Sequence, residues 1–350
     1  MKHFSDKIIN WYNQNKRDLP WRNTKDAYLI WLSEIILQQT RVEQGTAYYL
    51  KFASNFPTVK HLANADNDKV MKLWQGLGYY SRARNLHTTA KIITDKFKGK
   101  FPDSYEDILS LKGVGDYTAA AIASFAFNKP HAVVDGNVYR VLSRIFGIET
   151  PIDSSKGKKE FYALANKLID KKEPAQFNQA IMELGAIQCK PANPDCSICP
   201  LNTMCFAFAR KKVAEFPVKE KKMKVRNRYF YYIVLNYKGK TAVNKRSAKD
   251  IWTNLYDFPL IETDKELTEE QFLKSADWKK FIGKTVYTIA SFSSPQKHIL
   301  SHQKIYARFI EINSKSAFDK LIPATAIVIN KMDIHEYAVP RLIDLYLEKE

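Results

Sequence analysis

The spacing of apolar side chains divides the chain into two parts with different expected secondary structure. Up to about residue 208, apolar residues recur every three or four positions, as in residues 66–97, and this spacing is typical of amphipathic helices. From residue 229 on, short aromatic and β-branched runs predict strands. Residues 229–246 predict two strands joined by a Lys-Gly-Lys turn, and residues 284–294 and 303–313 predict further strands. We therefore predict an all-α part followed by a smaller α+β domain.

A carboxylate stands inside a strongly apolar predicted helix. Residues 30–37 are apolar on most sides, which indicates a buried helix. Glu34 nevertheless shares a helical face with Ile30 and Leu37, and the polar residues 38–40 follow it. Burial penalises the ionised form of a carboxyl group, so a buried Glu34 would keep its proton near neutral pH and could act as a general acid. The structural alternative is a glutamate that faces solvent.

Residues 108–127 predict a helix, a Gly-Val-Gly turn and a second helix. Gly113 and Gly115 permit a tight reversal and the close approach of another backbone, and Asp116 is expected to cap the second helix. Free amides at such a helix N-terminus bind anions, a DNA phosphate among them. Asp135 is expected to stand just before another helix, where capping is its ordinary role.

The charge of the chain narrows the class of partner. Its 350 residues carry a formal net charge of +18, which favours nucleic acid or an anionic membrane surface. The longest apolar stretch, residues 119–127, is far shorter than the ~20 residues of a membrane-spanning helix, and no signal-peptide core begins the chain. We therefore expect a soluble cytoplasmic protein with no membrane partner. Residues 210–228, with a net charge of +7, predict a solvated basic linker.

All four cysteines fall within one short segment, at Cys189, Cys196, Cys199 and Cys205. Disulfides are rare in cytoplasmic proteins, so metal binding is the better interpretation. Four thiolates in a compact loop suit either a structural zinc ion or a 4Fe-4S cluster, and the spacing by itself does not choose between them.

Seven segments together resemble the adenine DNA glycosylases of the MutY family, a branch of the helix-hairpin-helix glycosylases. They are LPWR (19–22), WLSEIILQQTRV (31–42), GLGYYSRARNL (76–86), LKGVGDYTAAAI (111–122), VDGNVYRVLSR (134–144), FNQAIMELGA (177–186) and the cysteine loop. The resemblance implies a monomer that removes adenine opposite 8-oxoguanine or guanine from double-stranded DNA. It also implies a 4Fe-4S cluster, because the family carries one on a loop with the same cysteine spacing.

The resemblance further implies a role for each residue of the reaction site. Glu34 matches the acid that protonates N7 of the flipped adenine and later activates water. Asp135 matches the carboxylate that stabilises the oxocarbenium-like sugar, as in retaining glycosidases. Asn137 matches a residue that orients this site, and Tyr117 matches one that lines it. Endonuclease III-like enzymes have a catalytic lysine where Tyr117 stands, so a monofunctional glycosylase is implied.

The family also places residues at the DNA and around the adenine pocket. Gln39 and Tyr79 match side chains that wedge into the base stack and hold the gap open once adenine leaves. The rest of the predicted substrate- and DNA-binding set in the helical part is Trp21, Arg22, Gln38, Thr40, Gly113, Gly115 and Gln179.

The C-terminal part resembles the MutT-like (Nudix-fold) domain of the same family. Residues 297–305 match its Phe-Ser-His loop, which reads 8-oxoguanine on the opposite strand. Leu300 replaces the phenylalanine, so the wedge is aliphatic, whereas Ser301 and His302 remain. The acidic helix motif of active Nudix hydrolases is missing, so this domain is expected to bind and not to hydrolyse.

Two alternatives remain beside this interpretation. One is a thymine- or pyrimidine-directed glycosylase of the same superfamily, and the other is a non-catalytic iron–sulfur DNA-binding protein. The second predicts loss of the carboxylate pair, yet both carboxylates are present.

The resemblance also predicts the domain boundaries. The expected parts are a helix-hairpin-helix glycosylase domain (1–208, with a helical barrel lobe, 26–129, and an iron–sulfur lobe, 1–25 plus 130–208), a basic linker (209–228) and a MutT-like recognition domain (229–350).

Overall fold

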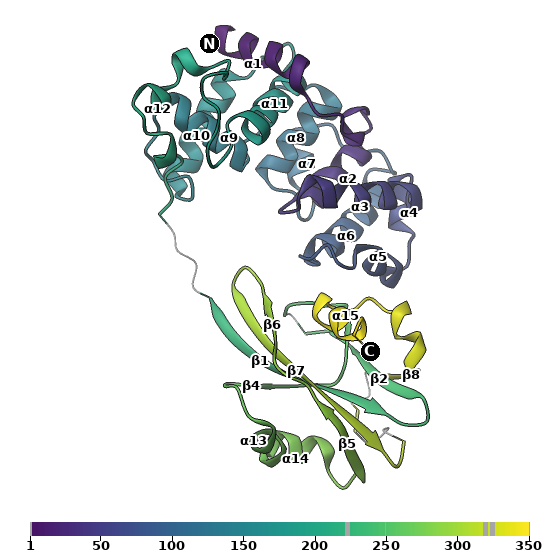
Figure 1. The fold of residues 1–350 in the computed structure, drawn as a ribbon. Coiled ribbons are helices and arrows are strands. Elements are labelled where there is room, and N and C mark those ends of the chain that lie inside the picture. The colour runs from purple at the N-terminus through teal and green to yellow at the C-terminus, as the bar shows by residue number, and fades with distance from the viewer. Residues whose placement is uncertain (1, 221–224, 249, 318–320, 323–325, 350) are drawn as a thin grey trace. The chain divides into compact units, whose positions relative to one another are not determined.

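The computed structural model describes residues 2–220, 225–248, 250–317, 321–322 and 326–349. The chain forms two compact units (Figure 1). The first unit is Met1–Ala65 with Arg84–Lys221, and the second is Asp66–Ala83 with Lys222–Glu350.

Helices form the chain up to residue 220. Side chains of Asp26, Thr58 and Ser154 accept backbone N–H groups at three helix starts, which is how the sequence fixes these boundaries. In chain order the helices are α1 (Lys2–Asn15), η1 (Pro20–Arg22), α2 (Ala27–Leu37), α3 (Val42–Asn55), α4 (Val59–Ala63), α5 (Asn67–Trp74), α6 (Ser81–Lys96), α7 (Tyr105–Leu109), α8 (Asp116–Phe127), α9 (Gly136–Phe146), α10 (Ser155–Leu168), α11 (Pro174–Glu183), the π-helix η2 (Leu184–Gln188), η3 (Asn202–Met204), α12 (Phe206–Ala209) and η4 (Val213–Glu215).

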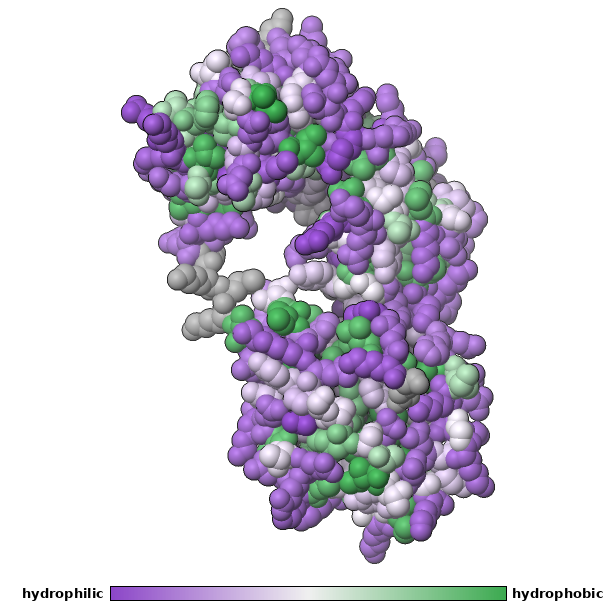
Figure 2. All heavy atoms as spheres, viewed as in Figure 1, coloured by the Kyte–Doolittle hydropathy of each residue, from purple (hydrophilic) through white to green (hydrophobic). Residues whose placement is uncertain are grey.

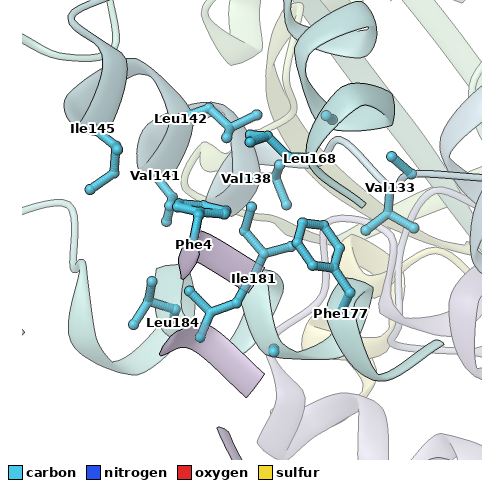
Figure 3. Packing of buried hydrophobic residues seen from close by; sticks show 14 of the residues in the cluster. Phe4, Val133, Val138, Val141, Leu142, Ile145, Leu168, Phe177, Ile181 and Leu184 are labelled. Atoms are coloured by element: carbon cyan, nitrogen blue, oxygen red, sulfur yellow. The ribbon is translucent and has the colours of Figure 1, made fainter. Parts of the chain in front are cut away.

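A hydrophobic core in the first unit holds α1, α9 and α11 together. Figure 3 shows Phe4 of α1 close to Val138 of α9 and Ile181 of α11, and all three are buried. Burying one such side chain contributes about 1.5–3 kcal/mol relative to leaving it exposed. The buried apolar residues of α9, Val138, Val141, Leu142 and Ile145, recur at helical spacing, so this face of the helix packs into the core.

The second unit contains two β-sheets. The first has strand order β4-β1-β7-β5, with β6 also paired to β7, and the second has order β3-β2-β8. β1 and β7 pair in parallel, whereas the other pairs are antiparallel. The elements are β1 (Arg226–Asn236), β2 (Lys240–Lys245), β3 (Tyr256–Asp257), β4 (Leu260–Thr263), α13 (Glu269–Lys274), α14 (Ala276–Ile282), β5 (Tyr287–Phe292), β6 (Gln296–Ile299), β7 (Gln303–Ser314), β8 (Ala326–Asn330), η5 (Lys331–Glu336) and α15 (Arg341–Leu347).

Helices cover both faces of the first sheet. On one face, Phe272 of α13 stacks on Tyr231 of β1, with ring centroids 4.3 Å apart. On the other, Tyr346 of α15 stacks on Phe309 of β7, with centroids 4.0 Å apart.

These elements confirm the predicted fold class of a helical part followed by an α+β part. Strands β1, β2, β5 and β7 form where the sequence predicted them. The predicted linker includes η4 and the start of β1, and its residues 221–224 lie outside the described part of the chain. No helix among the described residues is long and apolar enough to cross a membrane. The face of the molecule in Figure 2 is mostly hydrophilic, with apolar residues in small groups.

Candidate functional site

A cavity of about 250 Å³ lies in the first unit. The segment after α1, helix α2, and the starts of α8 and α9 contribute to its wall. The structure thus brings together residues that are far apart in the sequence. The predicted site residues on this wall are Trp21, Arg22, Glu34, Thr40, Tyr117, Asp135, Asn137 and Gln179.

Glu34 lies near the C-terminal end of α2, with 7% of its surface exposed. Asp26 fixes the start of this helix, because its carboxylate accepts a backbone N–H of the first turn at 2.8 Å. Burial raises the pKa of Glu34 to about 7, a hydrogen bond from Tyr117 opposes the rise, and the charge of Asp135 adds to it. A carboxyl group with this pKa is half protonated near neutral pH and can donate a proton.

Asp135 caps α9 and faces the cavity with the same carboxylate. Its Oδ1 accepts the backbone N–H of Val138 at 2.8 Å, and its Oδ2 accepts the side-chain amide of Asn137 at 2.8 Å. Burial raises the pKa of Asp135, and these hydrogen bonds oppose the rise because they stabilise the ionised form. The capping prediction for Asp135 is therefore confirmed, and the carboxylate is also available to the cavity.

A chain of hydrogen bonds runs from Asp135 to the first cysteine. Asn137 donates to Asp135, and its own Oδ1 accepts from Arg140 Nη2 at 2.8 Å. Arg140 also donates to the carbonyl oxygens of Gly185 at 2.7 Å and Cys189 at 2.8 Å. Gly185 belongs to the π-helix η2, and a Cβ there would lie 2.6 Å from the Cβ of Asn137. The close packing of α9 on η2 therefore needs glycine at this position.

The cavity wall also contains an ion-pair network that the sequence did not predict. Glu183 is 1% exposed, and Arg17 and Arg22 each place an Nη2 atom 2.7 Å from its Oε2. Burial alone would raise the pKa of Glu183, but hydrogen bonds from the two guanidinium groups lower it to about 2. The available signal was an acidic residue inside the apolar segment 177–186, the same signal that marked Glu34.

Two predicted DNA wedges adopt an unusual backbone conformation. α2 ends at Leu37, Gln38 is its C-cap, and Gln39 follows with φ 54°, so both glutamines lie beyond the helix. Tyr79 has φ 48° and is 46% exposed. Such left-handed conformations at residues other than glycine cluster at binding sites.

The Gly-Val-Gly turn joins α7 to α8. Gly113 has φ 80°, and a Cβ there would lie 2.8 Å from the side chain of Asn85, so glycine is required. A Cβ at Gly115 would meet nothing within 4 Å. The prediction that Asp116 caps α8 is wrong: Gly115 is the N-cap, and the Asp116 carboxylate instead accepts from the Tyr105 hydroxyl at 3.4 Å. Because no side chain caps α8, its first amides suit an external anion.

The predicted reading loop forms the turn between β6 and β7 in the second unit. Leu300 N–H donates to the carbonyl oxygen of Gln303 at 2.8 Å, which closes the turn. Ser301 and His302 lie at its tip, and His302 is exposed.

The four predicted metal ligands, Cys189, Cys196, Cys199 and Cys205, line one cavity as free cysteines. Burial raises the pKa of Cys199 to about 11, and the other three cysteines add to the rise. Arg144, which is 3% exposed, lies 3.4 Å from Cys189 Sγ and donates to it. Among the described residues, no three His, Cys, Asp or Glu side chains are arranged as a metal-binding group.

Comparisons with protein families match both parts of the chain. Residues 32–171 match the family of HhH-GPD superfamily base excision DNA repair proteins, and residues 230–349 match a NUDIX domain. The adenine DNA glycosylase of Buchnera aphidicola subsp. Schizaphis graminum is 33% identical over 350 residues, covering 99% of the chain and 98% of that relative. The adenine DNA glycosylase of Homo sapiens is 43% identical over 216 residues, covering 59% of the chain and 40% of that relative.

Solved structures match the helical part. A thermostable thymine-DNA glycosylase is 31% identical with a TM-score of 0.56, covering 60% of the chain and 96% of that protein. A trapped covalent intermediate of endonuclease III with DNA is 22% identical with a TM-score of 0.52, covering 59% of the chain and 94% of that protein. The second likeness shows a shared fold.

Proposed function

The chain belongs to the adenine DNA glycosylases, as its motifs predicted, and we propose that it removes adenine opposite 8-oxoguanine or guanine. It is thus a base excision repair enzyme that hydrolyses an N-glycosidic bond. The observation that carries the proposal is a buried carboxyl group with a pKa of about 7 in a cavity that a second carboxylate also lines.

The two carboxylates have surroundings that suit different roles. Glu34 lies within a helix among apolar residues, which favours the protonated form. Asp135 receives two hydrogen bonds at a helix N-terminus, which favours the ionised form. In our proposal Glu34 gives its proton to N7 of adenine and then takes a proton from the attacking water, while Asp135 stabilises positive charge on the sugar.

The cavity wall supports a reaction without strand cleavage. None of the described residues that line it is a lysine. Tyr117 stands at the position where the family resemblance places the catalytic lysine of endonuclease III-like enzymes. Asn137 acts as a positioning residue, because it holds Asp135 and is itself held by Arg140. Single-turnover reactions on duplexes carrying A opposite 8-oxoguanine, A opposite guanine and T opposite guanine test the proposal. Release of thymine but not adenine would support the pyrimidine-directed alternative.

We propose that the cysteine loop holds a 4Fe-4S cluster. The donor set fits, because four thiols line one cavity and each of three has its pKa raised in part by neighbouring cysteines. Cys189, Cys196, Cys199 and Cys205 would be the ligands. When bound, the cluster would tie together four points of a loop that has little regular structure of its own.

Cys199→Ser is expected to abolish or weaken the brown colour of the purified protein and to lower its affinity for DNA. The variant removes one ligand while it keeps nearly the same side-chain volume. Iron and sulfide content, together with visible absorbance, measure the result, and Ser197→Ala in the same loop is the control that should keep its iron. Stoichiometric zinc without iron in the wild-type protein would overturn the cluster assignment.

The double variant Ser301→Ala with His302→Ala is expected to narrow the preference for A opposite 8-oxoguanine over A opposite guanine. A lost base contact costs ~1–3 kcal/mol, so the preference should fall by a factor between about 5 and 150. Activity on A opposite guanine should stay close to wild type, because the turn carries no part of the reaction site. Single-turnover rates on both duplexes measure this, and equal losses would show that the turn does not read the opposite base.

A further inference from the structure

One face of the first sheet in the second unit is covered over only part of its length. Alternate residues of a strand face the same side, so Tyr306 of β7 shares a face with Ile310 and Ile312. These isoleucines are buried in the core with α13 and α14. In Figure 1 the two helices lie toward the β5 end of the sheet, whereas β6 extends away from them.

The uncovered end of this face carries two tyrosines, two lysines and the exposed Ile299. Tyr229 of β1 pairs with Tyr306 of β7, which in turn pairs with Lys297 of β6. Lys304 lies two residues before Tyr306 and pairs with Ile299, so it shares the face. Lys297 is exposed, and the other three side chains are half-buried. Tyr229, Lys297, Lys304 and Tyr306 are called the open strip below.

The ring faces in the open strip are already in contact. Tyr229 stacks on Tyr306 with centroids 5.4 Å apart and an interplanar angle of 18°. The Lys297 ammonium lies 6.0 Å from the centre of the Tyr306 ring. A nucleic-acid base therefore has no place between these rings, and the strip offers ammonium groups and phenol hydroxyls instead. Such groups are typical ligands of phosphate oxygens.

Two acidic side chains near the open strip, Glu262 and Glu266, are paired with arginines. Glu262 of β4 pairs with Phe230, so it lies on the opposite face, where it binds Arg228. Thr263 is the β4 residue that pairs with Tyr229. Glu266 forms an ion pair with Arg308. The strip therefore presents positive charge, in a chain with a net charge of +18.

We propose that the open strip binds the phosphate backbone of DNA. Lys297 and Lys304 lie on the two strands that the turn bearing Ser301 and His302 connects. The bound backbone would belong to the strand that this turn reads, and this choice of strand rests on the function proposed above. The contact would strengthen binding without regard to sequence, because backbone contacts position a duplex and base contacts specify it.

The double variant Lys297→Ala with Lys304→Ala tests the proposal in the full-length protein. The probes are a fully paired duplex and a duplex with a tetrahydrofuran abasic analogue opposite 8-oxoguanine. Fluorescence anisotropy at several salt concentrations gives the slope of log K against log salt. Each lost phosphate contact reduces this slope by about 0.9, so we expect a reduction of about 1 to 2 with both probes. Tyr306→Phe should weaken binding with little change of slope.

The matched control is Lys279→Ala with Lys280→Ala, which removes two exposed lysines from α14. It should keep the wild-type slope. An unchanged slope for the strip variant, or an equal reduction for both variants, would overturn the proposal and leave the strip to another partner, such as an acidic protein segment. A failure of the proposed reading function would be seen separately. In that case Ser301→Ala with His302→Ala would leave the preference for 8-oxoguanine over guanine unchanged, and this result does not depend on the salt slope of the Lys297→Ala, Lys304→Ala variant.

Discussion

Glu34→Gln should release adenine about 10²–10⁴-fold more slowly than the wild type in a single turnover, because a general acid contributes this much to a proton-transfer step. The substitution keeps the shape of a side chain that is 7% exposed, so binding of the substrate duplex should persist. Quenched reactions measure the rate, and anisotropy with the same duplex measures binding. Near-normal excision by the variant would remove Glu34 from the mechanism.

The single-turnover rate of the wild type should also fall with rising pH, because Glu34 loses its proton. The donor must be protonated, and burial raises its pKa to about 7. The single-turnover rate should therefore fall as the pH rises through about 7. The residual rate of Glu34→Gln should lack this fall, since an amide does not titrate in this range.

Stability provides the control for Glu34→Gln. Glu34 has a pKa of about 7 in the fold against an ordinary value of 4.5, so the folded state loses stability as the pH rises through this window. Above the window, the ionised carboxylate costs the fold about 3 kcal/mol, at 1.36 kcal/mol per pKa unit. The variant should therefore resist urea better than the wild type above the window and lose this advantage below it. A variant that is inactive because it is unfolded would show the opposite.

Local patterns in the sequence were sufficient for the features that depend on neighbouring residues. Apolar spacing around Glu34 predicted a buried helix and left a solvent-facing glutamate as the alternative, and the structure shows Glu34 buried. The position of Asp135 before α9 followed from the capping preference of aspartate. The same capping preference gave a wrong prediction for Asp116. Asp116 also precedes an apolar run, but the N-cap of α8 is Gly115, and Asp116 is the first residue of the helix.

Features that depend on distant residues could not be read in this way. Glu183 acquires its low pKa from Arg17 and Arg22, and Arg17 is 166 positions away in the sequence. The apolar segment around Glu183 marks it as unusual but does not identify these partners. The parallel pairing of β1 with β7 likewise has no local signal. β1 is a continuous buried run and β7 alternates only in part, and neither pattern identifies the partner strand or its direction. The open strip follows from that pairing, which brings Tyr229 beside Tyr306.

Asp135→Asn should reduce the rate of the chemical step by about 10²–10⁴-fold, the range seen when a preorganised group that stabilises transition-state charge is removed. Asparagine caps a helix about as well as aspartate, so the loss of stability from the cap itself should be below about 1 kcal/mol. The amide oxygen can still accept the N–H of Val138, whereas the amide nitrogen cannot accept from Asn137 as Oδ2 does. What the variant loses is therefore negative charge at the sugar and one hydrogen bond within the site.

Asp26→Asn is the matched control, because Asp26 caps α2 in the same unit and does not line the cavity. Both variants should melt within a few degrees of the wild type, since ~1 kcal/mol shifts the melting temperature of a domain this size by only about 2–4 °C. Excision should be slow for Asp135→Asn alone. If both variants excise adenine at the wild-type rate when folded, Asp135 is a cap and nothing more. The stabilising charge must then come from another group on the cavity wall, and Glu183, held ionised by two arginines, would be the first carboxylate to test.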